Sequence, residues 1–170
     1  MQRIISQKLH LSIPAVILAG CALFGGGPDD RVNSLKRSKD YTVKPPTNWS
    51  SIDRVDSDSA YRTSAGNIVT VTSSCDRDSK QPLELLTRHL LIGARKIQTI
   101  STEHITVSQA DGLYSHVQAQ LEGRPFELHL FVASLKGCIF DFSLVSPSTI
   151  NSTETLEFKT FLRSFQSVAQ

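Results

Sequence analysis

The chain has 170 residues, of which 39% are hydrophobic and 20% charged, values that are typical of a single globular domain. Seven prolines and nine glycines are too few for a fibrous or low-complexity protein. The formal net charge of +2 falls to 0 without the first 20 residues, because Arg3 and Lys8 lie there and no acidic residue does. Since a nucleic-acid-binding protein needs a basic surface, we expect no nucleic acid among the partners.

The first 20 residues have the parts of a secretory signal peptide. Arg3 and Lys8 make the start basic, and Leu11–Gly20 is an uncharged apolar run. This run is about half as long as the ~20 residues that a membrane-spanning helix needs, and Pro14 disfavours a helix there. We therefore expect residues 1–20 to be removed as a signal peptide.

The four residues Leu18-Ala19-Gly20-Cys21 resemble the lipobox of bacterial lipoproteins. The resemblance implies cleavage before Cys21 and acylation of its thiol and new amino group, which together anchor a protein stably in a bilayer. Ala22, rather than an aspartate, follows the cysteine; in enteric-type lipoproteins this pattern implies the outer membrane, with the domain facing the periplasm. The first expected partner is thus the lipid bilayer, bound through acylated Cys21. The alternatives are a soluble secreted protein and an N-terminal core helix that contains the cysteine.

The sequence predicts a lipidated cysteine followed by a flexible tether in residues 21–40, and a single folded domain in residues 41–170. From Gly25 to Asp40 the chain has one valine, one leucine and many glycines and charged residues. This composition favours a solvated linker. Contact between its basic residues and anionic lipid headgroups is the less favoured alternative.

The first half of the domain predicts a strand, a hairpin and a helix. Tyr41–Trp49 predicts a short strand, and Ser59–Cys75 predicts a β-hairpin that turns at Ser64–Asn67. Ser79–Ile97 predicts a helix, because Pro82 suits a first helical turn and apolar residues recur at helical spacing. The apolar face of this helix consists of Leu83, Leu86, Leu90, Ala94 and Ile97.

Four strands are expected next: Thr99–Val107, Gly112–Leu121, Pro125–Ser134 and Cys138–Ser146. A two-residue loop of type II′ character at Gly123-Arg124 would place Leu121 opposite Phe126. For the next turn, a two-residue loop at Leu135-Lys136 would put Asp141 among the core side chains. A three-residue loop that ends in Gly137 avoids this burial and is preferred.

The side chains of the last predicted hairpin divide into an apolar row and a polar row. The polar row consists of Gln118, Gln120, Glu127 and His129. We expect it to be open to solvent or covered by the N-terminal strand region. After Pro147, Asn151 and Glu154 predict the capped start of a helix, and the residues that follow make this C-terminal helix strongly amphipathic.

The order strand, hairpin, helix, meander, helix predicts an α+β fold. The sheet is expected to be an antiparallel meander of about six to seven strands, with the central and C-terminal helices packed on it. The pattern of Tyr41–Trp49, together with Gly137–Pro147 leading into a Phe-rich helix, resembles the PsbP/DcrB-like domains across residues 41–170. These domains occur in bacterial envelope lipoproteins, in photosystem II extrinsic proteins and in a nuclear-import factor. The resemblance implies a three-layer sandwich and a non-enzymatic accessory or binding role.

Two cysteines, Cys75 and Cys138, remain if Cys21 carries lipid. Both fall on predicted core-facing rows near strand ends. In an exported protein, two such thiols suggest a disulfide. Two buried reduced thiols are the alternative.

Catalytic and metal-binding motifs are absent from the sequence, so we expect no enzyme and no cofactor. His116 and His129 can share one sheet face, where Glu127 or His104 would have to supply a third metal ligand. Without a recognisable ligand spacing, scattered surface histidines are the preferred interpretation and no metal site is expected. Asp141 lacks a paired acid, which favours a solvated or ion-paired strand residue.

A partner contact is expected in Thr47–Ser64, a polar stretch with irregular patterning that contains Trp49, Asp53 and Arg54. Trp49 is alternatively a core residue that covers the sheet, which is the favoured interpretation of its ring. The leading hypothesis is a membrane-anchored envelope lipoprotein whose domain binds an unknown envelope protein or assists assembly. The alternative is a carrier of small hydrophobic ligands, with a pocket between the sheet and the C-terminal helix lined by Phe140, Phe142, Phe158, Phe161 and Phe165.

Overall fold

The computed structural model describes residues 38, 40–75 and 80–167. The predicted signal peptide, the lipidated Cys21 and most of the tether lie outside the described residues. The elements in chain order are β1 (Tyr41–Thr42), β2 (Ser50–Ser51), β3 (Ser59–Arg62), β4 (Ile68–Ser74), α1 (Leu83–His89), β5 (Arg95–Val107), β6 (Ala110–Leu121), β7 (Arg124–Leu135), β8 (Cys138–Ser146), α2 (Ser152–Arg163) and β9 (Gln166–Ser167). Among the described residues, neither helix is long and apolar enough to cross a membrane.

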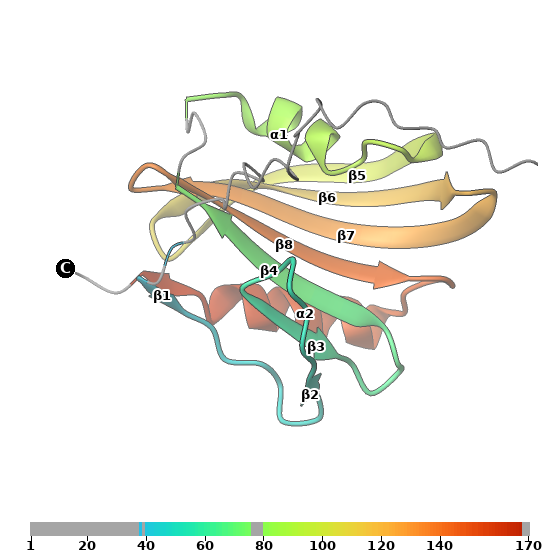
Figure 1. The fold of residues 1–170 in the computed structure, drawn as a ribbon, viewed down its shortest axis with the longest axis horizontal. Helices are drawn as coiled ribbons and strands as arrows, with labels where there is room; N and C mark the ends of the chain where they lie inside the picture. Colours follow the sequence, from blue (N-terminus) through green and yellow to red (C-terminus); the bar gives the residue numbers. More distant parts are fainter. Residues whose placement is uncertain (1–37, 39, 76–79, 168–170) are drawn as a thin grey trace, which may run out of the picture. The chain divides into compact units, whose positions relative to one another are not determined.

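Seven strands form one antiparallel sheet in the order β2-β3-β4-β8-β7-β6-β5, and the two helices lie on its opposite faces (Figure 1). β1 and β9 pair separately, which joins the start of the domain to the chain after α2. The predicted α+β fold, with an antiparallel meander and two packed helices, is confirmed.

Both faces of the central strands of the sheet are buried, because each face carries a helix. Successive side chains of a strand point to opposite faces, so in β7 Phe131 packs in the aromatic core under α2, whereas Val132 packs against Leu86 of α1. Every residue from Glu127 to Ala133 is buried. The expectation that the polar row is open to solvent is therefore confirmed for Gln118, which is exposed, but it is wrong for Glu127 and His129, which are buried. His129 contacts Phe158 of α2 and not the N-terminal strands.

The register between β6 and β7 differs from the prediction by two residues. Glu122 and Gly123 form the turn, and both have positive φ, +51° and +81°, as a type I′ turn requires. Phe126 therefore lies opposite Ala119 rather than opposite Leu121. A shift of two residues keeps every side chain on its face, so the predicted apolar row is unaffected.

The turn between β7 and β8 has two residues, one fewer than predicted. Lys136 and Gly137, again both at positive φ, form a two-residue loop that pairs Phe142 with Phe131 and Asp141 with Val132. Phe142 is in the core, as expected, but the argument for the longer loop assumed that only one face of the sheet is buried. With two covered faces, Asp141 lies half-buried on the α1 face.

The helix predicted over Ser79–Ile97 is shortened to α1, Leu83–His89. Gly93 has φ +90°, in the left-handed region, and from Arg95 onward the chain pairs with β6. Ile97 therefore belongs to β5 and not to the helical face. Pairing with β6 therefore determines the structure of this segment, although its apolar residues have helical spacing. The predicted strand over Tyr41–Trp49 is likewise reduced to two residues, Tyr41–Thr42.

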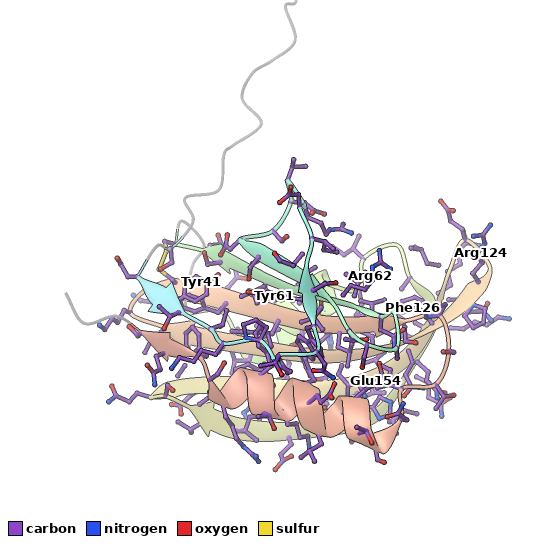
Figure 2. The ribbon with its side chains drawn as sticks, turned by 90° about the horizontal axis from the view of Figure 1, so that it is seen from below. Tyr41, Tyr61, Arg62, Arg124, Phe126 and Glu154 are labelled. Carbon is purple, nitrogen blue, oxygen red and sulfur yellow. A yellow bond between two sulfur atoms is a disulfide. The ribbon has the colours of Figure 1, made fainter. Side chains whose placement is uncertain are left out.

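The start of α2 is fixed by the predicted cap and by a buried acid. The Asn151 side chain accepts a hydrogen bond from the backbone N–H of Glu154 at 2.9 Å. Glu154, which is buried, accepts through Oε1 from the Asn67 amide at 2.6 Å and from the Thr63 hydroxyl at 3.2 Å. These bonds join the first turn of α2 to the β3–β4 turn, near the position labelled Glu154 in Figure 2.

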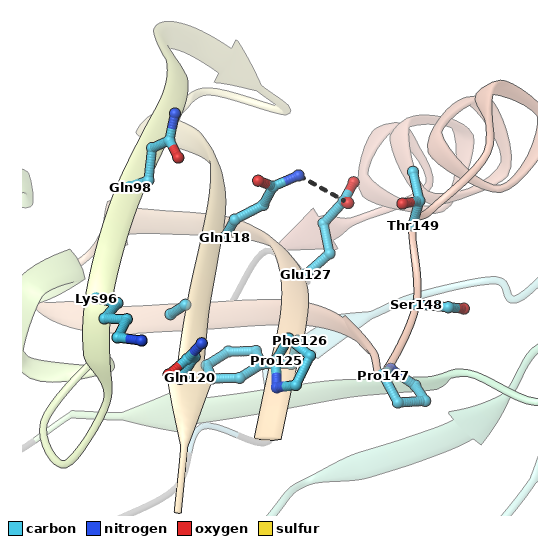
Figure 3. A pocket seen from close by; sticks show the side chains of 11 residues that line it. Lys96, Gln98, Gln118, Gln120, Pro125, Phe126, Glu127, Pro147, Ser148 and Thr149 are labelled. Carbon is cyan, nitrogen blue, oxygen red and sulfur yellow. Dashed lines mark hydrogen bonds between the residues drawn. The ribbon is translucent and has the colours of Figure 1, made fainter. Parts of the chain in front are cut away.

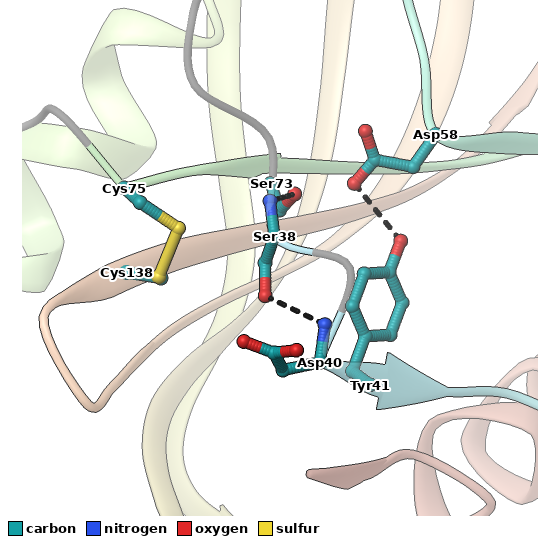
Figure 4. The surroundings of a disulfide bond; sticks show 7 residues. All are labelled: Ser38, Asp40, Tyr41, Asp58, Ser73, Cys75 and Cys138. Atoms are coloured by element: carbon teal, nitrogen blue, oxygen red, sulfur yellow. Dashed lines mark hydrogen bonds between the residues drawn. A yellow bond between two sulfur atoms is a disulfide. The ribbon is translucent and has the colours of Figure 1, made fainter. Parts of the chain in front are cut away.

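A disulfide joins Cys75, directly after β4, to Cys138, the first residue of β8 (Figure 4). The two cysteines are 63 residues apart in the sequence. The bond closes the end of the sheet from which the chain leaves for α1. Beside it, the Ser38 backbone N–H donates to the Ser73 hydroxyl at 2.7 Å and the Tyr41 hydroxyl donates to Asp58 at 2.9 Å, so the start of the domain is held against β4.

Candidate functional site

Five polar side chains meet on the α2 face of β6 and β7, in what we call the histidine cluster. They are Tyr114, His116, Gln118, Glu127 and His129. In the observed register His116 lies directly opposite His129, and Gln118 directly opposite Glu127. Alternate residues of one strand share a face, and β6 pairs with β7 at these positions. All five side chains therefore lie together on the α2 face.

The cluster is held together by side-chain contacts. The Tyr114 hydroxyl lies 2.6 Å from His129 Nδ1, and His116 Nε2 lies 2.8 Å from Glu127 Oε1. Gln118 Nε2 donates to the other Glu127 oxygen at 3.3 Å. The two imidazole rings are stacked, with centroids 4.3 Å apart and planes inclined by 15°. The cluster therefore places two imidazole rings and one carboxylate side by side.

Burial sets the protonation of two members. Tyr114 is 4% exposed and His129 is 3% exposed. Burial, followed by the nearby His116, lowers the pKa of His129 to about 4, so this imidazole is neutral at neutral pH. Burial also raises the pKa of Tyr114 to about 12, so its hydroxyl keeps its proton. A neutral imidazole is the form that binds metal ions.

One nitrogen of the cluster lacks a partner. Within the described part of the chain, His129 Nε2 is buried and makes no hydrogen bond. The metal-ligating atoms of His116, Glu127 and His129 lie within 4.8 Å of one another. These three residues could hold a metal ion. Tyr114 contacts His129 and Gln118 donates a hydrogen bond to Glu127, so each fixes the position of one ligand.

The other two histidines of the domain are separate from this cluster. His89 and His104 are exposed, and His104 Nε2 lies 3.3 Å from Glu84 Oε1 of α1. The prediction of scattered surface histidines is therefore correct for His89 and His104 but wrong for His129, which is buried. That His116 and His129 share a face could be predicted from the alternation of the strands; the burial of that face could not.

A cleft opens beside Glu127 (Figure 3). It has a volume of about 390 Å³, and its lining includes Gln118, Glu127, Lys96 and the Pro147–Thr149 loop after β8. The close-up shows the Gln118–Glu127 hydrogen bond at its wall. The cleft gives solvent a route to the edge of the histidine cluster.

The predicted partner contacts divide into buried and exposed residues. Trp49 is 8% exposed; its ring packs on Phe161 at 5.3 Å between centroids, and its indole N–H donates to Glu157 at 3.1 Å. Trp49 is therefore a core residue, which confirms the interpretation favoured from the sequence.

Asp53 and Arg54, by contrast, are exposed in the loop between β2 and β3, residues 52–58, which we call the β2–β3 loop. Val55 at its tip is fully exposed, and Arg54 forms an ion pair with Asp56 at 2.8 Å. In Figure 2 this teal loop projects from the body of the domain. Its position suits contact with a partner.

The phenylalanines considered as a ligand pocket are packed on one another. Phe165 contacts Phe140 and Phe142, with ring centroids 5.0 Å and 5.5 Å apart, and Phe142 contacts Phe161 at 6.1 Å. These rings, together with Phe158, are all buried in one core cluster. Their arrangement is that of a filled core and gives the ligand-carrier hypothesis no support.

The described fold is a PsbP-like α+β sandwich. Neither a family model nor a curated protein matches the sequence, but solved structures do. Cyanobacterial PsbP (CyanoP) from Synechocystis sp. PCC 6803 matches with 17% identity and a TM-score of 0.55, over 88% of this chain and 98% of that one.

Two further structures have the same fold. LpqN, described as involved in cell envelope biogenesis of Mycobacterium tuberculosis, is 10% identical with a TM-score of 0.56, over 82% of this chain and 88% of its own. A protein from Bacteroides thetaiotaomicron VPI-5482 is 13% identical with a TM-score of 0.55, over 77% of this chain. This chain spans 46% of that protein's length. At such identities the likeness is one of fold.

Proposed function

We propose that this protein is a lipid-anchored accessory protein of a bacterial envelope, and that its domain binds a protein partner without catalysing a reaction. The observation that carries the binding function is the β2–β3 loop, which presents the exposed side chains of Asp53, Arg54 and Val55. The base of the loop is firm, because Trp49 and Tyr61 on either side of it pack on Phe161. Exposed side chains on a fixed base are typical of a recognition loop.

The fold supports the accessory role. CyanoP and LpqN share it, and LpqN is described as involved in envelope biogenesis. The lipobox around Cys21 supports the anchor, in the outer membrane with the domain facing the periplasm. Labelling of cells with radioactive palmitate, followed by separation of inner and outer membranes, tests this part. Label in the outer-membrane fraction that is lost in Cys21→Ala is expected; equal label in both proteins contradicts the anchor.

Site-specific photo-crosslinking in cells tests the binding function. A photoreactive amino acid at Val55 is expected to give one discrete adduct, whose partner is identified by mass spectrometry. The matched control carries the same amino acid at Glu122, in the exposed β6–β7 turn. The double variant Asp53→Ala/Arg54→Ala should weaken the Val55 adduct and leave expression unchanged. Equal adducts at both positions, or none at Val55, would contradict a partner at this loop.

A further inference from the structure

We infer that His116, Glu127 and His129 form a binding site for a divalent transition-metal ion of the Zn²⁺ type. Two imidazole nitrogens and one carboxylate oxygen are a donor set that suits zinc. All three come from the two neighbouring strands β6 and β7, a rigid part of the fold. The inference stands independently of whether the domain binds a protein partner.

His129 provides the strongest observation. Its Nε2 is buried and has no hydrogen-bond partner among the described residues, whereas its Nδ1 lies 2.6 Å from the Tyr114 hydroxyl. If the ring proton is on Nδ1, it is donated to the Tyr114 hydroxyl, and Nε2 carries the free lone pair within 4.8 Å of the ligand atoms of His116 and Glu127. Metal-bound histidines usually donate their other ring N–H in this way, which fixes the ring and its tautomer. A ligand for Nε2 also explains a buried polar atom whose isolation is otherwise unfavourable.

Glu127 and His116 provide the other two ligands. Their ligating atoms, Oε1 and Nε2, are 2.8 Å apart and share a hydrogen bond. Gln118 donates to the second Glu127 oxygen at 3.3 Å, so one oxygen is held and the other faces the histidines. Metal binding replaces the His116–Glu127 hydrogen bond, with the His116 proton moving to Nδ1 or to solvent.

The distances require a small adjustment. The three ligand atoms lie within 4.8 Å of one another, and in a tetrahedral zinc site with bonds of about 2.0–2.1 Å they would be roughly 3.4 Å apart. Because the imidazole planes are nearly parallel, the His116 ring must turn toward the lone pair of His129, whose ring the Tyr114 hydroxyl holds. The side chain of His116 is 22% exposed and has room for this turn.

Three protein ligands leave one coordination position for water or another ligand. The cleft beside Glu127 reaches this edge of the cluster, so an ion has a route of entry. One nearby charge opposes a cation: the Lys159 ammonium lies 4.9 Å from the centre of the Tyr114 ring. The site therefore depends on its ligands and not on a generally negative environment.

Zn²⁺ binding by the full chain in detergent, measured in competition with a chromogenic chelator, tests the site. We expect one ion per chain and a dissociation constant at least tenfold higher in His116→Ala and in Glu127→Gln. His104→Ala is the matched control, because His104 is an exposed histidine beside an acid, and should bind as the wild type does. Absence of binding by the wild type, or a wild-type dissociation constant in both His116→Ala and Glu127→Gln, would overturn the inference.

A second measurement uses the unaltered protein and does not depend on how the variants fold. In long-range ¹H–¹⁵N spectra of the histidine rings, Zn²⁺ should shift the Nε2 resonance of His129, while Nδ1 keeps its proton. Co²⁺ in place of Zn²⁺ should give visible absorption of a four- or five-coordinate ion. An unchanged His129 ring at saturating Zn²⁺ would show that bound ions are adventitious.

Discussion

The two faces of the sheet are covered very differently. α2 has 12 residues, a side-chain N-cap at Asn151 and a large aromatic cluster beneath it. α1 has seven residues, and its N-cap position, Pro82, forms no capping bond. Beneath α1 lie two small aliphatic clusters, one around Leu86 and one around Leu91.

This difference shows where the fold can accommodate polar groups. The histidine cluster lies on the better-packed α2 face, beside the aromatic core and not on the thinly covered α1 face. A rigid hydrophobic surrounding strengthens the interactions of buried polar side chains. The predictions below test whether the α2 face is indeed the more stable half, beginning with the largest expected effect.

Removal of a core ring should affect stability most. Phe142 is fully buried and its ring contacts three other phenylalanines, so Phe142→Ala should reduce the free energy of unfolding by about 3–5 kcal/mol. Urea titration followed by circular dichroism measures this. Leu156→Ala, at an exposed position of α2, should change it by less than about 0.5 kcal/mol. If Leu86→Ala, at a buried position of α1, reduces the free energy of unfolding as much as Phe142→Ala does, the two faces do not differ in stability.

The disulfide should contribute the next largest effect. Cys75→Ser/Cys138→Ser removes a cross-link that closes a span of 63 residues, and such bonds typically contribute about 2–4 kcal/mol by restricting the unfolded chain. Thermal unfolding with and without reductant measures it. Reductant should lower the melting temperature of the wild type and leave that of the double variant unchanged. Insensitivity of the wild type would contradict the prediction.

Acid should destabilise the metal-free protein through His129. Its pKa is about 4 in the folded state against 6.5 as the ordinary value, so between these pH values the unfolded chain binds more protons. The stability that the neutral His129 contributes is therefore fully present above pH 6.5, declines as the pH falls toward 4, and declines no further below that. The shift corresponds to about 3 kcal/mol.

Urea unfolding between pH 4 and pH 7, with a chelator present, measures the loss for His129. His104→Ala, a variant of an exposed histidine, should keep the same pH dependence, and His129→Phe should reduce it. A wild type equally stable at pH 4.5 and pH 7 would contradict a neutral, buried His129.

Hydrogen exchange should distinguish the two helices. Amides in the middle of α2 should exchange at least tenfold more slowly than those of α1, because α1 is short, lacks a side-chain cap and covers fewer buried residues. Exchange measured by NMR at neutral pH compares them directly. Equal protection in both helices would show that the sheet and both layers open as one unit.

The smallest effect concerns the cap of α2. Asn151→Ala removes the hydrogen bond to the Glu154 N–H and should cost about 1 kcal/mol. Ser152→Ala, at the exposed first residue of the helix, is the control and should change stability little. If Asn151→Ala is neutral, Glu154 and its bonds to the β3–β4 turn suffice to fix the helix start.

Much of the fold could be predicted from local patterns. Alternation predicted the rows of β6 and β7 correctly, whereas the apolar row of β8 was expected beside Val132 and lies on the opposite face, under α2. The Asn151–Glu154 pair predicted the start of α2 because capping depends on a few adjacent residues. The registers were missed because Glu122 and Lys136 adopt positive φ, which a non-glycine residue rarely does. The length of α1 was missed because strand pairing beyond Gly93 depends on β6, which lies later in the chain.

The histidine cluster was only partly predictable. The alternation of the strands places His116 and His129 on one face, but the two-residue shift in register decides that they lie opposite each other. Their burial depends on α2, whose Phe158 covers the same face from more than 25 residues further along the chain. Neither the convergence of ligands nor the low pKa of His129 follows from spacing, because both result from tertiary packing.

The edge strand β5 has an irregular backbone, which bears on pairing between sheets of different molecules. It is one of the two edge strands of the sheet, with the two-residue β2 at the other edge, and is exposed along most of its 13 residues. Its outer side therefore offers a template for an incoming strand. Its pairing with β6 is interrupted by register shifts between Arg95 and Gln98 and between Thr99 and Ser101, and Lys96 has φ +50°. A second sheet cannot continue such an irregular ladder in register. Irregular edge strands of this kind disfavour edge-to-edge aggregation.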